Sequence, residues 1–140
     1  ADGALMVRSP DLGIEELVTN DAAILHNDRA FTLEGRLDFA INSGGIKIHP
    51  EQLEQALAAE GIRAAIAPIE DEVFGQLPVL ILSDQGQLTQ AKALLQKWPK
   101  SQRPKHYLWL SAWPEVAGGK LDRHGLTLWV KSHQDRLCPL

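Results

Sequence analysis

The chain has 140 residues, of which 44% are hydrophobic, and a formal net charge of −4, which suits one domain, or one domain with a piece of another, around a hydrophobic core. The acidic balance argues against a nucleic-acid-binding protein, the apolar runs are too short to span a bilayer, and the five histidines lack metal-ligand spacing, so no metal site is predicted. Because no secretory signal is recognised and Cys138 is the single cysteine, we expect a cytoplasmic protein. The first residue is Ala1 in place of Met, which suggests a fragment or a processed chain.

Residues 1–37 are predicted to be rich in β-strands. The run Ala4–Arg8 is a strand candidate that ends at a Ser-Pro pair. Two further apolar runs, 22–25 and 30–33, flank His26–Arg29, whose Asn and Asp favour the turn of a hairpin. We therefore expect short antiparallel strands in this segment.

From residue 38 the pattern changes to a second hairpin, with a turn over Asn42–Gly45, and then to alternating helices and strands. The last helix is expected after the N-cap residue Asp122, and Gly125 inside it costs about 1 kcal/mol relative to Ala. Helices are also expected to begin at Pro50 and at Leu88. The residues expected on the core face of the last helix are Leu126, Trp129, Val130 and Leu137. Strands are expected over 39–41, 46–48, 63–69, 77–82 and 106–110.

The predicted fold class is therefore α+β, with a small three-stranded sheet and helices over residues 38–140. The β-rich segment 1–37 precedes this domain. A short junction, Arg36–Asp38, lies between the two parts, and such element-terminal residues can absorb the backbone change of a hinge.

The segment Pro114–Arg123 contains a proline-led turn, two glycines and Lys120. Glycines allow positive φ and close approach to a ligand, and a lysine on such a loop is a mobile charge suited to phosphate or carboxylate oxygens. A phosphate-binding P-loop is excluded, because Pro114 stands where its first glycine belongs and Leu121 where its Ser or Thr belongs. The alternative interpretation is an ordinary Gly-Gly turn with a solvated lysine.

Together with this segment, residues 35–54 resemble motifs of the adenylate-forming superfamily, which comprises acyl- and aryl-CoA ligases, luciferases and peptide-synthetase adenylation domains. Residues 35–54 are similar to the hinge motif of that superfamily, and 114–126 to its C-terminal lysine motif. Thr19–Asp21 resembles the ribose-binding motif, and Phe74–Gly75 resembles the stretch between the first two strands of the lid domain. The motifs occur in the family's order and spacing over nearly the whole chain.

Two positions depart from the family pattern. Asn20 replaces the usual glycine of the ribose motif, and Asn42 replaces a lysine that many members carry in the hinge motif. The short C-terminal domain, the Ser43–Gly45 turn and the altered ribose motif are most similar to the o-succinylbenzoate–CoA ligase group, which serves menaquinone and phylloquinone synthesis.

The resemblance implies three residues that meet the nucleotide. Lys120 is the expected catalytic lysine, which holds the substrate carboxylate and the phosphate oxygens together through charge. Asp21 is expected to accept hydrogen bonds from the ribose hydroxyls, and Arg36 to reach the ribose or phosphate side. The alternatives are a turn aspartate for Asp21 and, for Arg36, an ion pair that braces the hairpin.

The resemblance also implies a pivot and a channel. Asp38 is the expected hinge residue between the large N-terminal domain, whose end is 1–37, and the C-terminal lid domain, 38–140. Gly44 and Gly45 are expected to line the coenzyme A channel, where a side chain would block the passage. The alternatives are a plain turn aspartate and an ordinary tight hairpin turn.

The implied activity is an AMP-forming acid–thiol ligase with ATP and coenzyme A as substrates and Mg²⁺ bound through ATP. A carboxylate attacks the α-phosphate, and the thiol then attacks the acyl-adenylate while the lid shields it from water. Because the family's phosphate loop and acyl pocket are not among these residues, we expect the isolated chain to be inactive alone. The alternatives are another acid, a carrier-protein thiol as the acceptor, or a non-catalytic module that binds a nucleotide or coenzyme A.

Overall fold

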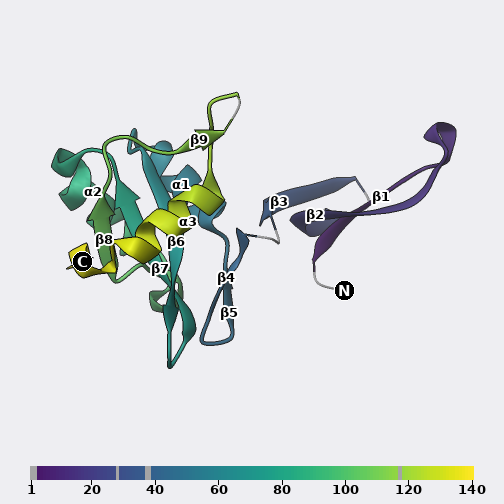
Figure 1. The fold of residues 1–140 in the computed structure, drawn as a ribbon. Coiled ribbons are helices and arrows are strands. Elements are labelled where there is room, and N and C mark those ends of the chain that lie inside the picture. Colours follow the sequence, from purple (N-terminus) through teal and green to yellow (C-terminus); the bar gives the residue numbers. More distant parts are fainter. Residues whose placement is uncertain (1–2, 28, 37–38, 117) are drawn as a thin grey trace. The chain divides into compact units, whose positions relative to one another are not determined.

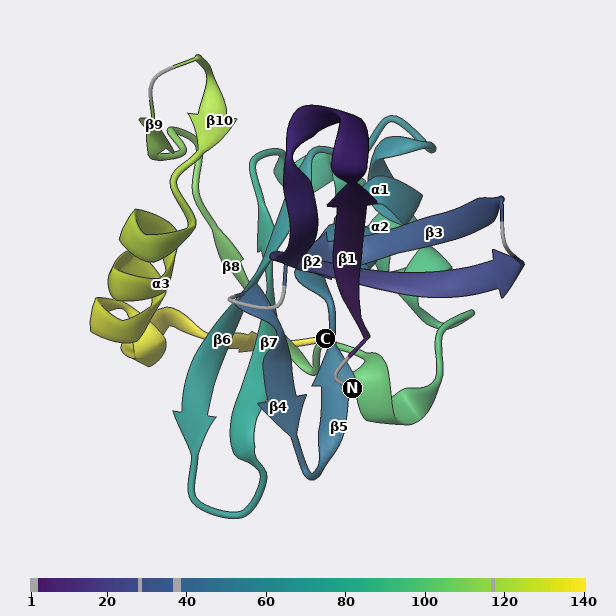
Figure 2. The same ribbon diagram turned by 90° about the vertical axis from the view of Figure 1, so that its right-hand side faces the viewer.

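The computed structural model describes residues 3–27, 29–36, 39–116 and 118–140. The chain separates into two compact units, Ala1–Ala40 and Ile41–Leu140 (Figures 1 and 2). The boundary expected between residues 37 and 38 lies outside the described residues.

The Ala1–Ala40 unit is a three-stranded antiparallel sheet in the order β1-β2-β3. Its strands are β1 (Ala4–Ser9), β2 (Ile14–Asn27) and β3 (Ala30–Arg36), with a short 3₁₀ helix, η1 (Pro10–Leu12), between the first two. The predicted strands and hairpin are confirmed, although β2 begins well before the expected run.

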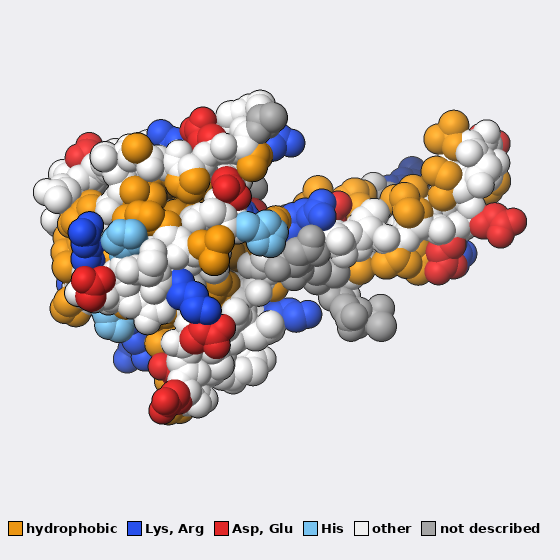
Figure 3. Space-filling model, in the orientation of Figure 1, with side chains coloured by type: hydrophobic (Ala, Val, Ile, Leu, Met, Phe, Trp, Pro, Cys, Tyr) orange, Lys and Arg blue, Asp and Glu red, His pale blue; other side chains and the backbone are white. Residues whose placement is uncertain are grey.

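None of the side chains described in this unit is buried. Hydrophobic side chains lie open along it, as the orange atoms in Figure 3 show. A three-stranded sheet needs a covered apolar face for stability of its own. The exposed large hydrophobic residues of this unit are Met6, Val7, Leu12, Leu17, Val18, Ile24, Leu25, Phe31 and Leu33.

The Ile41–Leu140 unit contains a six-stranded mixed sheet, which confirms the α+β class. The strands expected over 63–69, 77–82 and 106–110 are present as β6 (Ala64–Asp71), β7 (Gly75–Leu82) and β8 (His106–Trp109), and β7 pairs antiparallel with β6 and parallel with β8. The sheet is wider than the three strands predicted, because the hairpin β4–β5 joins β7 and the C-terminal residues pair with β8. The strands are β4 (Ile41–Ser43), β5 (Ile46–Ile48), β6 (Ala64–Asp71), β7 (Gly75–Leu82), β8 (His106–Trp109) and β11 (Cys138–Pro139).

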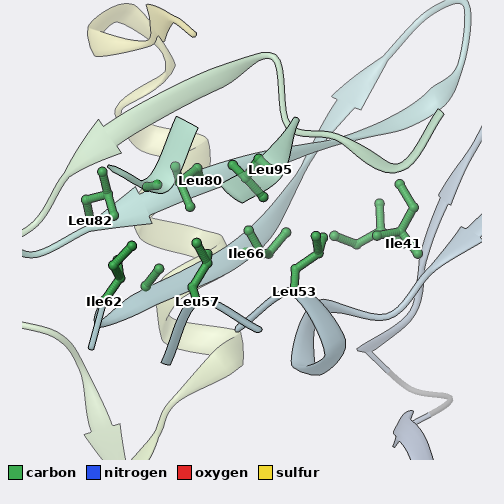
Figure 4. Close-up of a cluster of buried hydrophobic side chains, with 11 residues drawn as sticks. Ile41, Leu53, Leu57, Ile62, Ile66, Leu80, Leu82 and Leu95 are labelled. Carbon is green, nitrogen blue, oxygen red and sulfur yellow. The ribbon is translucent and has the colours of Figure 1, made fainter. Parts of the chain in front are cut away.

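Three helices cover this sheet: α1 (Pro50–Ala58), α2 (Leu88–Leu95) and α3 (Arg123–Ser132). The side chains of β6 and β7 alternate between two apolar clusters, as the period of two in a strand requires. Helices α1 and α2 pack against one cluster, part of which Figure 4 shows, and α3 packs against the other. The four residues Val79–Leu82 are fully buried, because both faces of β7 are covered.

The predicted helix starts at Pro50 and Leu88 and the N-cap at Asp122 are confirmed. Leu137 does not lie on the last helix, because α3 ends at Ser132 and a 3₁₀ helix, η5 (Gln134–Arg136), follows. Leu137 still packs against the same apolar cluster as α3, so the pattern identified its burial but not its backbone.

Candidate functional site

Lys120 lies on a small exposed hairpin formed by β9 (Glu115–Val116) and β10 (Lys120–Leu121). Gly118 and Gly119 have φ of 88° and 74°, which residues with a Cβ rarely adopt. The N–H of Gly119 donates to the Val116 carbonyl at 3.2 Å, closing the turn. The segment predicted to be a flexible loop is therefore a hairpin that presents its lysine to solvent.

The helix that follows this hairpin starts with a side-chain cap. The Oδ1 atom of Asp122 accepts from the Gly125 N–H at 3.0 Å, and the Asp122 N–H donates to the Pro114 carbonyl at 2.9 Å. A Cβ at Gly125 would overlap with Oδ2 of Asp122, so the glycine makes room for the cap. These contacts close the base of the hairpin.

A partly buried charge cluster joins the start of α3 to α1. Arg123 donates to both carboxylate oxygens of Glu54, with Nη1 to Oε2 at 3.0 Å and a shorter bond from Nη2 to Oε1. Its Nε atom lies 3.8 Å from Oε1 of Glu51. The three side chains are only 16%, 15% and 21% exposed, in the order Arg123, Glu54, Glu51.

Glu54 is also held by the backbone of the sheet. Its Oε2 accepts from the Ile66 N–H at 2.8 Å. Burial raises the pKa of Glu54 and the neighbouring Glu51 adds to the rise, whereas Arg123 and the Ile66 N–H oppose it. One guanidinium between two partly buried carboxylates therefore connects α1, β6 and the base of the lysine hairpin.

The other end of the hairpin is held at the surface. Arg63 lies 3.2 Å from Glu115 and stacks over the Trp113 ring, with 4.7 Å from its guanidinium carbon to the ring centroid. Arg63 and Glu115 are 59% and 47% exposed, so solvent screens their attraction. A pocket of about 260 Å³ lies between the two attachments; it is lined by Glu54, Arg63, Ala64, Trp113, Glu115, Gly119, Leu121 and Arg123.

Gly44 and Gly45 form the two-residue turn between β4 and β5, with φ of 57° and 83°. Positive φ at both positions is typical of a type I′ hairpin. The Gly44 N–H donates to the Phe74 carbonyl at 2.9 Å, and a Cβ at Gly44 would lie 2.9 Å from Cδ1 of Phe74. A Cβ at Gly44 would therefore require the Phe74 ring to move.

A second pocket, of about 130 Å³, borders this turn. Lys100, Arg103 and Lys105 line it beside Gly44, and the Lys105 ammonium lies 5.6 Å from the centroid of the Phe74 ring. The glycine turn therefore lies beside a group of cationic side chains.

Asp21 and Arg36 face each other in the Ala1–Ala40 unit. They are register partners on β2 and β3, with Arg36 Nη1 3.8 Å from Asp21 Oδ1. Thr19 supports this pair, because its hydroxyl accepts from the Asp21 N–H at 3.3 Å and donates to the Leu5 carbonyl at 2.7 Å. The turn alternative for Asp21 is wrong, since it lies inside a strand, and the ion-pair alternative for Arg36 is present.

The structure brings some of the predicted site residues together and separates others. Asp21 pairs with Arg36, and Gly44 adjoins Gly45, whereas the hairpin of Lys120 lies at the opposite end of the Ile41–Leu140 unit from the β4–β5 turn (Figures 1 and 2). Asp38 lies outside the described residues.

The sequence did not reveal the pairing of Arg123 with Glu54 and Glu51. The two glutamates are three residues apart on α1, a spacing that places them on one helix face, but nothing local identifies the cation opposite them. Glu54 and Arg123 are 69 residues apart in the chain, so only the fold brings them together.

Comparisons with known proteins agree on one superfamily. A 2-succinylbenzoate–CoA ligase of Escherichia coli strain K12 is 33% identical over 121 residues, which are 83% of this chain and 26% of that protein. Among solved structures, an Escherichia coli MenE variant with bound OSB-AMS has 31% identity and a TM-score of 0.69, over 93% of this chain and 28% of that one. An o-succinylbenzoate CoA synthetase from Bacillus subtilis, in complex with the acyl-adenylate intermediate OSB-AMP, has 27% identity and a TM-score of 0.67, over 79% and 24%.

The match is to one part of longer proteins, because the chain spans about a quarter of the length of the curated relatives it matches. No protein-family model matches the chain. None of the described helices has the length and apolar character needed to cross a membrane. The chain belongs to the adenylate-forming superfamily and corresponds to the C-terminal portion of its CoA ligases.

Proposed function

We propose that the protein acts as the C-terminal part of an AMP-forming acid–CoA ligase, with o-succinylbenzoate as the acid, in menaquinone or phylloquinone biosynthesis. A carboxylate reacts with ATP to give an acyl-adenylate and pyrophosphate, and coenzyme A then displaces AMP to give the thioester. The large N-terminal domain of the same enzyme supplies the rest of the site. The similarity to 2-succinylbenzoate–CoA ligases supports this choice of acid.

The observation that carries the proposal is the exposed hairpin of Lys120, at the opposite end of its unit from the Gly44–Gly45 turn. Because they lie at opposite ends, the two features would meet the substrate site in two different orientations of this unit. A lid that presents them in turn needs a pivot, and Asp38 is our proposed hinge residue. Rigid-body rotation about a few linker residues is a common way to achieve this.

In the first orientation Lys120 holds the acid carboxylate and a phosphate oxygen together. Its ammonium offsets the charge of two anions that must approach each other, and it transfers no proton. Asp21 accepts from the ribose hydroxyls, and Arg36, half exposed beside it, donates to the ribose or phosphate side. The Mg²⁺ ion enters with ATP, and no described group of three or more His, Cys, Asp or Glu could hold a metal ion.

In the second orientation Gly44 and Gly45 border the path of the coenzyme A thiol. A turn without side chains allows a narrow arm to pass close to the backbone. The cations Lys100, Arg103 and Lys105 beside Gly44 support this assignment, because coenzyme A carries phosphates that need positive charge near the channel entrance.

The open apolar side chains of the Ala1–Ala40 unit support its assignment to the end of the large N-terminal domain, with 38–140 as the lid. Exposed apolar area on this scale normally marks a surface that another body covers. The neighbouring domain of the same enzyme is the proposed cover.

The test is to measure the half-reactions of the full-length enzyme separately. Lys120→Ala should lower acid-dependent ATP–pyrophosphate exchange by roughly 10²–10³-fold, the usual effect of removing one charge-stabilising donor. The same variant should form thioester from preformed acyl-adenylate at the parent rate. Lys131→Ala, on the exposed end of α3, is the matched control. An equal loss of both half-reactions would contradict the lid assignment.

Two further measurements test the rest of the proposal. A panel of aryl and fatty acids, with coenzyme A and carrier-protein thiols as acceptors, should single out o-succinylbenzoate and coenzyme A. AMP release by the isolated 140-residue chain should be absent, and full turnover by it would show that the N-terminal domain is not required.

A further inference from the structure

The β9–β10 hairpin is too small to hold its own position. Each of its strands has two residues, and an isolated two-stranded hairpin is marginal in water. Gly118 and Gly119 in its turn add no side chain, and nothing lies within 4 Å of a Cβ built on either. The position of Lys120 therefore depends on what holds the two ends of the hairpin.

The two ends are held unequally. Glu115, where the chain enters the hairpin, pairs with Arg63, and their side chains are 47% and 59% exposed in that order. Arg123, just after the exit, pairs with Glu54 at 16% and 15% exposure. Exposed ion pairs are screened and loosely oriented, whereas buried bidentate pairs restrict both partners. The exit, which is the strand of Lys120 itself, is the firmly held end.

The partly buried pair connects the hairpin to the packed core of its unit. Helix α1 buries Leu53 and Leu57, each 1% exposed, and Glu54 lies on the same helix. The Ile66 N–H of β6 donates to Glu54, which fixes the carboxylate plane. Because the guanidinium is planar and meets both oxygens of Glu54, the orientation of Arg123 follows from that plane.

We propose that Arg123 is a positioning residue for Lys120. By its bidentate pair with Glu54, with Glu51 as a second partner, it fixes the orientation in which the hairpin presents the lysine ammonium. Arg123 acts through the hairpin and does not itself contact the reactants. This inference rests on the proposed function, because it assigns Arg123 to the adenylation step of that reaction.

The first test measures both half-reactions of the full-length enzyme. Arg123→Gln should lower acid-dependent ATP–pyrophosphate exchange on the order of 100-fold, since a shift of about 1 Å in a reacting group has an effect of this size. Thioester formation from preformed acyl-adenylate should keep the parent rate. Arg123→Lys keeps the charge but loses the fork, so it should recover part of the exchange rate.

A second variant guards against a folding defect in the first. Glu54→Gln removes the charge of the carboxylate but keeps an oxygen that accepts from the Ile66 N–H. It should show the same selective loss of adenylation. The matched control is Arg63→Gln, which loosens the exposed end of the hairpin. It should change the rate of ATP–pyrophosphate exchange much less.

Hydrogen exchange gives a readout that does not depend on activity. In Arg123→Gln the backbone amides of Lys120 and Leu121 should exchange faster than in the parent, while those of β6 and β7 should be unchanged. Arg63→Gln should leave the exchange of Lys120 and Leu121 close to that of the parent.

Each outcome decides for or against the proposal. The proposal would be overturned by equal loss of both half-reactions or by unchanged amide hydrogen exchange at Lys120. It would also be overturned if Arg123→Gln and Glu54→Gln both kept the parent rate of ATP–pyrophosphate exchange, or if both variants failed to fold. Lys120→Ala in the same assays separates this inference from the proposed function. Normal adenylation in Lys120→Ala would overturn the proposed function. If Lys120→Ala loses adenylation while the Arg123 and Glu54 variants keep it, only the positioning role is overturned.

Discussion

Two hairpins of the Ile41–Leu140 unit have glycines at positive φ in their turns, yet they are held in different ways. The β4–β5 hairpin buries Ile41 and Ile48 in the core, and its Gly44 N–H donates to the Phe74 carbonyl in the turn between β6 and β7. The β9–β10 hairpin is exposed and is held at its base by ion pairs and a helix cap. Packing thus fixes one turn, whereas ion pairs, a helix cap and the packing of Leu121 against the apolar core hold the other.

The difference matches what each hairpin is proposed to do. A channel wall made of backbone must keep its shape, and close packing against Phe74 provides that at Gly44. A lysine that visits two anions must extend from the surface and still point in one direction. Attachment at the base leaves the tip of such a hairpin accessible.

The largest effect on stability is expected from breaking the packed hairpin. Gly44→Ala puts a Cβ 2.9 Å from Cδ1 of Phe74 at a φ of 57°, so we expect about 1–2 kcal/mol of backbone strain and a further loss from moving the ring. Gly45→Ala, with open space around its Cβ, should show the backbone strain alone. Urea unfolding of both variants measures the difference.

Adding Phe74→Ala to both glycine variants sharpens this prediction. The excess of Gly44→Ala over Gly45→Ala should disappear when the ring is absent, because only Gly44 meets it. An excess that survives the loss of the ring would show that Phe74 is not its cause.

A smaller effect is expected from the cap beneath the lysine hairpin. Asp122→Ala removes the bond to the Gly125 N–H and should lower the free energy of unfolding by about 1 kcal/mol. Gly125→Ala should also destabilise, although alanine is the better helix former, because its Cβ would meet Oδ2 of Asp122. The double variant should be more stable than the two losses added together, and strict additivity in thermal unfolding would contradict the steric explanation.

The ion-pair cluster at the base of the lysine hairpin should make the stability of the fold depend on pH. Burial raises the pKa of Glu54 above its ordinary value of 4.5, so between these two pKa values the folded state binds more protons than the unfolded state. The contribution of Glu54 to the free energy of unfolding therefore falls as pH rises through this window. Relative to Glu54→Gln, which cannot titrate, the parent should lose thermal stability as pH rises above 4.5. A relative gain by the parent would show that Arg123 outweighs burial.

The smallest effect is expected at the exposed end of the lysine hairpin. A double-mutant cycle of Arg63→Gln and Glu115→Gln should give a coupling energy of about 0.2–1 kcal/mol, since both side chains are about half exposed. The coupling should shrink in 1 M salt, where exposed charges are screened. A larger coupling energy that does not depend on salt would show that Arg63 and Glu115 hold their end of the lysine hairpin as firmly as Arg123 and Glu54 hold the other end.

Much of the fold was readable from local patterns. The apolar run 77–82 predicted a strand, and Pro50 and Asp122 predicted helix starts, because each signal acts within a few residues. The pattern failed at Leu137, where burial was predicted correctly but helix continuity was not. The width of the sheet was also missed, because β11 and the β4–β5 hairpin join it through pairs remote in sequence.

The candidate site divides in the same way. The glycines at 44 and 45 and the lysine at 120 were identifiable from motifs, because short motifs keep their residue types at fixed spacing. The side chains that contact the predicted site residues were not identifiable. Neither the Phe74 ring against Gly44 nor the Arg36 side chain beside Asp21 is adjacent in sequence to the residue that it contacts.

The amino-acid sequence by itself determined the superfamily, the α+β class and the residues proposed to meet ATP and coenzyme A, since all three follow from residue types in a fixed order. Only the tertiary structure decided that Arg123 meets Glu54 across 69 positions and that the lysine hairpin and the glycine turn lie at opposite ends of one unit. The physical reason is that this partly buried ion pair depends on the packing of α1, α3 and the sheet, which no local segment encodes.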